Sequence, residues 1–100
     1  MGATRRMGGI VPTLLAFHEV DDVEHWLRSP KREEVFGPLG ITGRLFTDPA
    51  KTNRVGLLVD IPDMEAFQQL MQSDEGAEAM RFDGVRPDTL VFLEEASGHL

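Results

Sequence analysis

The sequence contains no cysteine, and its apolar residues never form a long uninterrupted run. Without cysteine the chain has no disulfide, no thiol nucleophile, no thiolate-bound zinc and no ordinary iron–sulfur cluster. The longest apolar stretch, 55–59, is interrupted by Gly56 and is far shorter than the roughly 20 residues of a membrane-spanning helix. These absences exclude several classes of enzyme and predict a protein that does not cross a membrane.

Positive charge is also scarce. The 10 lysines and arginines are outnumbered by 17 aspartates and glutamates, which gives a net charge of −7. Binding to nucleic-acid phosphates depends on basic groups, so we expect no nucleic-acid partner. Residues 1–12 lack the apolar segment of a secretion signal, which favours a cytoplasmic protein. We interpret 1–12 as a flexible leader and 97–100 as a tail, on either side of a single domain at 13–96.

The first half of this domain predicts a strand, a broken helix and a second strand. Apolar, aromatic and β-branched residues fill 13–20, and the aspartates that follow are typical helix N-caps. Ser29 and Pro30 break the helix and start a second piece, which runs to about Phe36. The alternating residues of 41–47 predict the second strand.

The second half predicts a strand, a helix and a last strand. Branched apolar residues at every second position of 55–61 form the clearest strand pattern, and they predict a hairpin with 41–47. An amphipathic helix follows Pro62, Ser73 starts its continuation, and 89–94 predicts the last strand. The predicted order is βαββαβ. It indicates an α+β, ferredoxin-like fold with a four-stranded antiparallel sheet and helices on one face.

The first predicted strand is apolar on both of its faces. Leu15 and Phe17 lie on one side of it, and Leu14 and Ala16 lie on the other. Two helices cover only one face of a four-stranded sheet, so the other face would expose a hydrophobic patch. We therefore expect a homodimer in which two sheets pack face to face around a shared, barrel-like interior. The alternative is a monomer with an imperfect pattern.

The order of elements, together with the segment SDEGAEAMRFDGV at 73–85, resembles the small dimeric α/β-barrel proteins over about 13–96. That superfamily includes cofactor-free monooxygenases, muconolactone isomerase-like and stress-response barrels, and polyketide cyclases. The resemblance implies a ferredoxin-like dimer that holds a small, often aromatic or apolar ligand between sheet and helices or inside the barrel. It carries no catalytic motif over to this sequence.

His18 is the candidate catalytic residue. Its imidazole titrates near neutral pH, and its place near the end of a strand lets it exchange a proton with a bound substrate. It shares a strand face with Leu14 and Ala16, and small residues such as Ala16 and Gly56 would leave room for a ligand beside it. The alternative is a partly buried histidine that hydrogen-bonds to nearby backbone.

Five more residues are candidates for ligand binding: Arg44, Phe46, Leu58, Asp60 and Trp26. If the strand residues point into a cavity, Arg44 holds a carboxylate or enolate while Asp60 or His18 acts as base. Otherwise Arg44 and Asp60 belong to an ion pair at the rim of the sheet. For Trp26 the alternative is a core residue that anchors the first helix to the sheet.

One short segment has the composition of a metal site. His18, Glu19, Asp22 and His25 lie within eight residues, and such side chains bind divalent cations. A strand-turn-helix junction points them in several directions, however, and helix capping explains the aspartate. We therefore predict no metal, and no phosphate-binding loop or other pattern indicates a cofactor.

Two hypotheses for the function stay open. One is a barrel that binds and transforms a small hydrophobic molecule, of the cofactor-free oxygenase, isomerase or cyclase type, with His18 transferring a proton. The other is a non-catalytic module for ligand sensing or self-assembly, which predicts an interior filled with apolar side chains. A third, an adaptor that binds another protein through its acidic half, requires an apolar patch that stays exposed after dimerisation.

Overall fold

A computed structural model describes residues 12–98. Within this range the strands and helices follow the predicted order βαββαβ, and each α consists of two short helices. The elements are β2 (Thr13–Glu19), α1 (Val23–Arg28), α2 (Lys31–Phe36), β3 (Thr42–Thr47), β4 (Arg54–Asp60), α3 (Met64–Met71), α4 (Asp74–Phe82) and β5 (Val91–Glu94). Two 3-10 helices, η1 (Gly37–Leu39) and η2 (Pro87–Thr89), precede β3 and β5.

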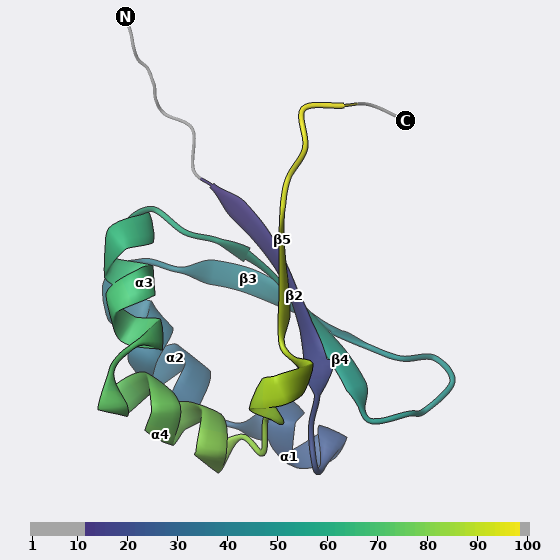
Figure 1. The fold of residues 1–100 in the computed structure, drawn as a ribbon. Coiled ribbons are helices and arrows are strands. Elements are labelled where there is room, and N and C mark those ends of the chain that lie inside the picture. The colour runs from purple at the N-terminus through teal and green to yellow at the C-terminus, as the bar shows by residue number, and fades with distance from the viewer. Residues whose placement is uncertain (1–11, 99–100) are drawn as a thin grey trace, which may run out of the picture.

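The sheet is antiparallel throughout, with the strand order β3-β4-β2-β5. β3 and β4 form the predicted hairpin, and β2 lies between β4 and β5, so the first strand of the domain is central. Figure 1 shows the four α-helices on one side of the sheet. This is the ferredoxin-like arrangement that the sequence predicts.

Side-chain caps determine where three of the helices begin. The carboxylate of Asp22 accepts a hydrogen bond from the N–H three residues later, at 3.1 Å, and Asp63 does the same at the start of α3. The hydroxyl of Ser73 accepts from an N–H of α4 at 3.0 Å. These caps satisfy backbone donors that have no partner inside the helix, which is why the predicted starts are confirmed.

The last strand is shorter than predicted. It begins at Val91, whereas the sequence predicts a strand from Thr89. The hydroxyl of Thr89 donates to the carbonyl of Arg86 at 2.6 Å and accepts from the N–H of Glu19 at 2.9 Å. These bonds hold η2 against the end of β2. Pro87 at the start of η2 favours that turn, because its fixed φ suits a helix and it has no N–H to donate to a sheet.

The two faces of the sheet are covered differently. Leu14, Ala16 and His18 point from β2 toward the helices and are buried, whereas Leu15 points the other way and is 38% exposed. The strand register places further apolar residues on the same helix-free side. We call this surface the open face, and its apolar residues are Leu15, Phe17, Phe46, Leu58, Val91 and Leu93.

The core on the helix side is divided into two clusters. The first contains Leu14, Ile41, Val59, Ile61 and Phe67, and the second contains Val20, Trp26 and Val55. Leu57 of β4 packs against both clusters. Between them the sheet presents Ala16, while α4 presents Gly76 and Ala79. Side chains this small do not fill the distance between sheet and helix, so a cavity remains there.

Gly76 also permits a sharp turn between α3 and α4. A Cβ atom added at this position would lie 2.1 Å from the carbonyl oxygen of Leu70, at the end of α3. At the other end of α4, Gly84 has a φ of +73° and returns the chain to the sheet, where Val85 bridges Val20. These two glycines therefore fix the position of α4 over the cavity.

Among residues 12–98, no helix is long and apolar enough to cross a membrane. The predicted leader, 1–12, lies outside the described residues except for Pro12, whose carbonyl accepts a hydrogen bond from the N–H of Ile61 at 2.9 Å. The predicted tail, 97–100, is described only as far as Gly98.

Candidate functional site

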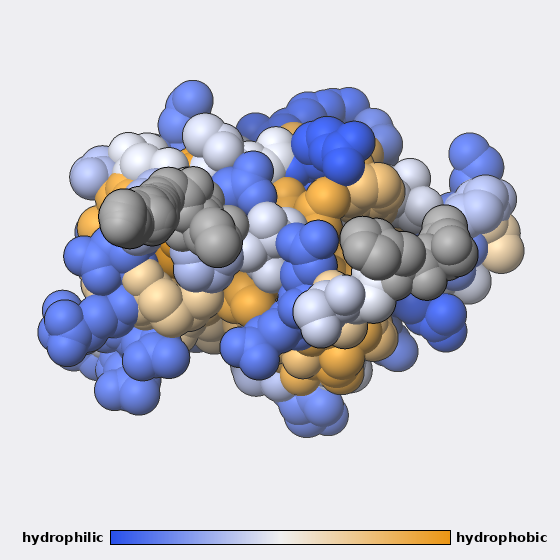
Figure 2. All heavy atoms as spheres, turned by 90° about the horizontal axis from the view of Figure 1, so that it is seen from above, coloured by the Kyte–Doolittle hydropathy of each residue, from blue (hydrophilic) through white to orange (hydrophobic). Residues whose placement is uncertain are grey.

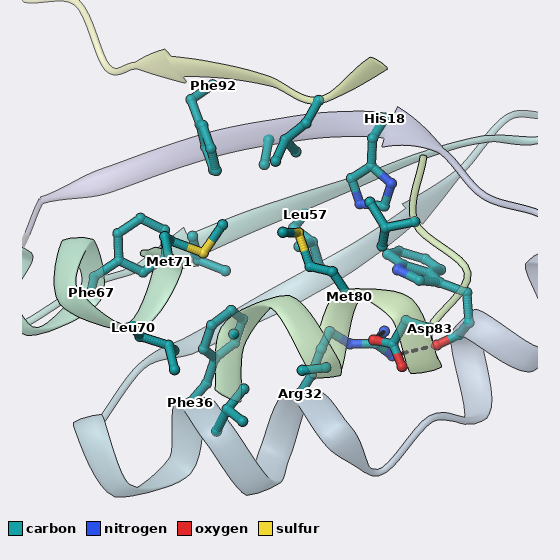
Figure 3. A pocket seen from close by; sticks show the side chains of 18 residues that line it. His18, Arg32, Phe36, Leu57, Phe67, Leu70, Met71, Met80, Asp83 and Phe92 are labelled. Carbon is teal, nitrogen blue, oxygen red and sulfur yellow. Dashed lines mark hydrogen bonds and ion pairs between the residues drawn. The ribbon is translucent and has the colours of Figure 1, made fainter. Parts of the chain in front are cut away.

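The cavity between the two core clusters has a volume of about 70 Å³. Most of its walls are apolar, with side chains from β2, β4, β5 and all four α-helices. Figure 3 shows His18, Arg32 and Asp83 together at one end, and Phe67 and Met71 toward the other. The cavity therefore has a polar end and an apolar end.

His18 is the one residue of β2 that brings a titratable group into this cavity. It is 3% exposed, and its ring points from the sheet into the space below (Figure 3). Nδ1 lies 3.4 Å from the carbonyl oxygen of Glu19, and within residues 12–98 Nε2 has no hydrogen-bond partner. A carbonyl oxygen can only accept, so Nδ1 carries the proton of this bond. Nε2 therefore presents a lone pair to the cavity.

Burial lowers the pKa of His18 from its ordinary value of about 6.5, because the charged imidazolium loses hydration. The hydrogen bond to Glu19 opposes this shift, and the positive charge of Arg32 adds to it. The Asp83 charge acts in the opposite direction to Arg32. His18 is therefore neutral at pH 7, and its Nε2 can accept a proton.

Arg32 of α2 and Asp83 at the end of α4 form an ion pair at the polar end. Nη1 of Arg32 lies 3.2 Å from Oδ2 of Asp83, and the two side chains are 15% and 5% exposed. The Ser29 hydroxyl donates to Oδ1 of Asp83, and Nη2 of Arg32 donates to the carbonyl of Trp26 at 2.6 Å. Burial lowers the pKa of Arg32 while the Asp83 charge opposes that shift. Both charges are thus paired and hydrogen-bonded, as buried charges must be.

Trp26 packs between these polar groups. The guanidinium carbon of Arg32 lies 4.6 Å from the centroid of the indole, and the His18 ring meets the indole edge-on at 5.8 Å. The ring face carries partial negative charge, which attracts the cation of Arg32. Trp26 is 1% exposed, so it is a core residue and a wall of the cavity at once. Its contact with a ligand stays a prediction.

The other four predicted ligand-binding residues lie on the far side of the sheet from the His18 ring. They are Arg44, Phe46, Leu58 and Asp60. Arg44 pairs with Leu58 across the hairpin, and the guanidinium of Arg44 lies 5.7 Å from the ring of Phe46. Binding of a ligand by these residues stays a prediction, but it concerns the open face and not the cavity.

Two details of the sequence hypothesis are changed by this arrangement. Gly56 was expected to leave room beside His18, but a Cβ at Gly56 would face Phe17 and Phe46 on the open face. Of the two small residues, Ala16 alone lines the cavity. Within residues 12–98, Arg44 and Asp60 form no ion pair, and Asp60 instead accepts a hydrogen bond from the Thr13 hydroxyl at 2.7 Å. Figure 2 shows hydrophobic residues reaching the surface in patches between hydrophilic ones.

The acidic and imidazole side chains of 18–25 point in different directions. Glu19 pairs with Arg86 at 3.2 Å, and Asp22 caps α1. Nε2 of His25 lies 2.6 Å from a carbonyl oxygen of α4. In the described part of the chain, no three His, Cys, Asp or Glu side chains are grouped so that they could hold a metal ion.

Sequence reasoning missed the group formed by Ser29, Arg32 and Asp83. Asp83 is 54 residues from Ser29 and 51 from Arg32, and in the sequence Ser29 and Asp83 are already explained as ends of helices. The sequence contains one indication that Arg32 is buried. Arg32 precedes Val35 and Phe36 by three and four residues, which places a charged residue on the apolar face of α2.

The fold is similar to that of solved structures. An antibiotic biosynthesis monooxygenase matches with a TM-score of 0.54 and 14% sequence identity, over 85% of this chain and 98% of its own. An ethyl tert-butyl ether D (EthD) family protein from Bacillus halodurans C-125 matches with a TM-score of 0.43 and 18% identity, over 89% of this chain and 100% of its own. No protein-family model matches the sequence, and no curated protein matches it.

These similarities concern the fold alone. The score of the second structure is too low to support an argument, and an identity of 14% to the first carries over no residue role. The first match does cover nearly the whole of both chains, which agrees with the strand order described above. The chain therefore has a ferredoxin-like fold, as its sequence pattern predicts.

Proposed function

We propose that this protein binds and transforms a small hydrophobic molecule in the cavity between sheet and helices. The reaction belongs to the cofactor-free oxygenase, isomerase or cyclase type, and His18 takes a proton from the substrate. One observation carries the proposal: a buried, neutral imidazole presents the lone pair of Nε2 to an otherwise apolar cavity. A histidine with a purely structural role would be expected to have partners for both ring nitrogens, because a buried acceptor without one costs about 1–3 kcal/mol.

The geometry also defines the chemistry of the ligand. The apolar walls fit an apolar body, and the Nε2 lone pair fits an O–H, an N–H or an acidic C–H directed at His18. Arg32 is already paired with Asp83, so the charge that stabilises an anionic intermediate comes from the imidazolium that forms when the proton moves. Oxygenation without a cofactor, isomerisation and cyclisation can each begin with such a proton transfer.

The fold comparison supports the oxygenase class among these three. The neighbour with the higher score is named as an antibiotic biosynthesis monooxygenase. This support is an analogy of fold, because different reactions recur on one fold and the active residues decide between them. Molecular oxygen would then be the second substrate.

We propose, in addition, that the working unit is a homodimer joined through the open face. All six apolar residues of that face, including Val91 at 39%, are exposed or half-exposed in the single chain. Contiguous apolar surface of this kind normally marks an interface. A second copy covers it with an equal surface, and two sheets packed in this way enclose a common interior.

The test of the binding proposal uses the fluorescence of Trp26, the single tryptophan of the sequence. We expect 1-naphthol, an aromatic with one hydroxyl, to quench the fluorescence of Trp26, because Trp26 forms a wall of the cavity in which 1-naphthol binds. His18→Leu keeps an apolar wall but removes the acceptor, so it should weaken 1-naphthol binding by about tenfold, the value of one buried hydrogen bond. Naphthalene, which lacks the hydroxyl, should bind both proteins equally. Equal weakening of the two ligands, or no quenching at all, would contradict the proposal.

A second candidate function is a non-catalytic module for ligand sensing or self-assembly. The observation in its favour is the size of the cavity: about 70 Å³ is room for a few waters, whereas a cavity that binds benzene measures about 150 Å³. Native mass spectrometry of the purified protein separates the two. A dimer that retains a small molecule and converts it supports the first candidate. A dimer that retains one unchanged, or that binds neither naphthalene nor 1-naphthol, supports the second.

A further inference from the structure

A second hollow lies on the helix side of the sheet, along β3. It is a groove of about 550 Å³ between β3 on one side and α2 and η1 on the other. β3 is an edge strand, and all its residues are exposed. Leu45 lines the groove and is 39% exposed, although it faces the side of the sheet that carries the helices. The helices therefore leave this strip of apolar surface uncovered.

The groove and the cavity share a wall. Four residues line both of them, Arg32 and Phe36 from α2 and Leu57 and Val59 from β4. A single layer of side chains thus separates the two spaces. Arg32 is held by Asp83, and the two β4 residues are held in the sheet. Phe36, the last residue of α2, is half-buried, and the centroid of its ring lies 6.3 Å from that of Phe67 on the cavity side.

The volumes show that the cavity alone is too small for the proposed ligand. A single aromatic ring needs about 150 Å³, roughly twice the space that the cavity provides. Additional space lies behind Phe36 in the groove, whose lining includes the apolar residues Ile41, Leu45, Leu57 and Val59. Because Phe36 belongs to α2, a change of its rotamer requires no movement of a strand.

We infer that the groove along β3 is the outer half of the ligand site and that Phe36 is the side chain that divides it from the inner half. This inference rests on the proposed function. The ligand is a hydroxyl-bearing molecule longer than one ring: its hydroxyl reaches His18 in the cavity, and its apolar body extends past Phe36 to Leu45. A one-ring ligand fills the cavity and the space that Phe36 vacates, and it does not reach Leu45.

The test compares two ligands and two leucine variants. The ligands are phenol, with one ring, and 1-naphthol, with two, and binding is measured by quenching of Trp26. Leu45→Arg places a long charged side chain in the groove. Leu27→Arg places the same side chain at a residue of nearly equal exposure on α1 that lines neither hollow. We expect Leu45→Arg to weaken 1-naphthol by about tenfold and phenol by less than about twofold, and Leu27→Arg to change neither. Equal melting temperatures of the two variants establish that both are folded.

The outcomes separate this inference from the function on which it rests. If 1-naphthol quenches Trp26 equally in both leucine variants, the groove is not part of the site, while the cavity proposal stands. If neither ligand quenches Trp26 in the unmodified protein, the proposed function fails and the inference fails with it. A second variant gives an independent check: Phe36→Ala removes the division and should raise the association rate of 1-naphthol in stopped flow, and an unchanged rate would overturn the role of Phe36.

Discussion

The covered face and the open face of the sheet consist of the same four strands, yet their side chains have opposite surroundings. Leu14 points to the helices and is 7% exposed, whereas its neighbour Leu15 points away from them and is 38% exposed. At the sheet edge Leu93 of the open face reaches 49%. Both faces are apolar, so composition alone does not explain the difference. What differs is the cover: helices lie on one face, and within residues 12–98 nothing lies on the other.

The arginines on the two faces also have different partners. On the covered side Arg32 is paired with Asp83 and stacked on Trp26. On the open face, Arg44 has no ion pair within residues 12–98 and lies over Phe46 instead. The comparison indicates that helices of this chain cover one face except along β3, whereas no element of residues 12–98 covers the open face. The predictions that follow test this difference.

The largest effect is expected from truncating one aromatic residue on each side. Trp26→Ala should lower the free energy of unfolding by about 3–5 kcal/mol, because it leaves a void in a filled interior. Phe46→Ala, whose side chain is 45% exposed, should lower it by less than about 1 kcal/mol in dilute protein. Urea unfolding followed by far-UV circular dichroism measures both. Equal losses in dilute protein would show that the two faces do not differ in packing.

A smaller effect is expected from removing one arginine on each side. Arg32→Met leaves Asp83 charged and buried without its partner, so we expect a loss of about 3 kcal/mol in the same unfolding measurement. Arg44→Met should change the stability of dilute protein by less than about 0.5 kcal/mol. The double variant Arg32→Met with Asp83→Leu should recover part of the loss. If the double variant loses at least as much free energy of unfolding as the two single variants added together, the pair is not the source of the effect.

The open face is tested by placing charge in it. In the proposed dimer, Leu15→Lys brings two unpaired ammonium groups into the interface. We therefore expect the dissociation constant of the dimer to increase by about a hundredfold or more. Leu27→Lys is the control, since Leu27 has nearly the same exposure, 37%, but lies on α1. Analytical ultracentrifugation over a dilution series measures both. If the unmodified protein sediments as a monomer at every concentration, the explanation of the open face by a second copy is wrong.

Much of the fold could be predicted because local signals determine it. Asp22, Asp63 and Ser73 cap helices through bonds that span three residues, and the sequence shows those spacings directly. The start of β5 could not be predicted in this way. Thr89 bonds to Glu19, 70 residues away, and no local pattern shows that this contact favours a 3-10 turn over a strand.

The candidate site was predictable only in part, for a related reason. Alternation along β2 shows that His18 and Ala16 share a face, and the cavity confirms that they do. Alternation along a strand does not show on which side of the sheet Arg44 lies. The side depends on the register between strands, and a slip of one residue reverses the side. Polar alternation normally decides the question. Here both faces are apolar, so the sequence offered no such marker.

The smallest predicted effect is the pH dependence that His18 contributes to stability. Burial lowers the pKa of His18 in the folded protein, while in the unfolded chain the pKa is about 6.5. The unfolded state therefore binds a proton first as the pH falls, which favours unfolding. The stability associated with His18 is complete well above pH 6.5 and decreases as the pH falls below that value, until the folded state is protonated as well.

The measurement is urea unfolding at pH 7.5 and at pH 5 for the unmodified protein and for His18→Gln. Groups that titrate elsewhere in the chain contribute to both proteins and cancel in the difference between them. The unmodified protein should lose more stability on acidification than His18→Gln does. If His18→Gln shows the same pH dependence as the unmodified protein, His18 is not held neutral by the cavity. The base that the proposed reaction requires would then have to be sought elsewhere.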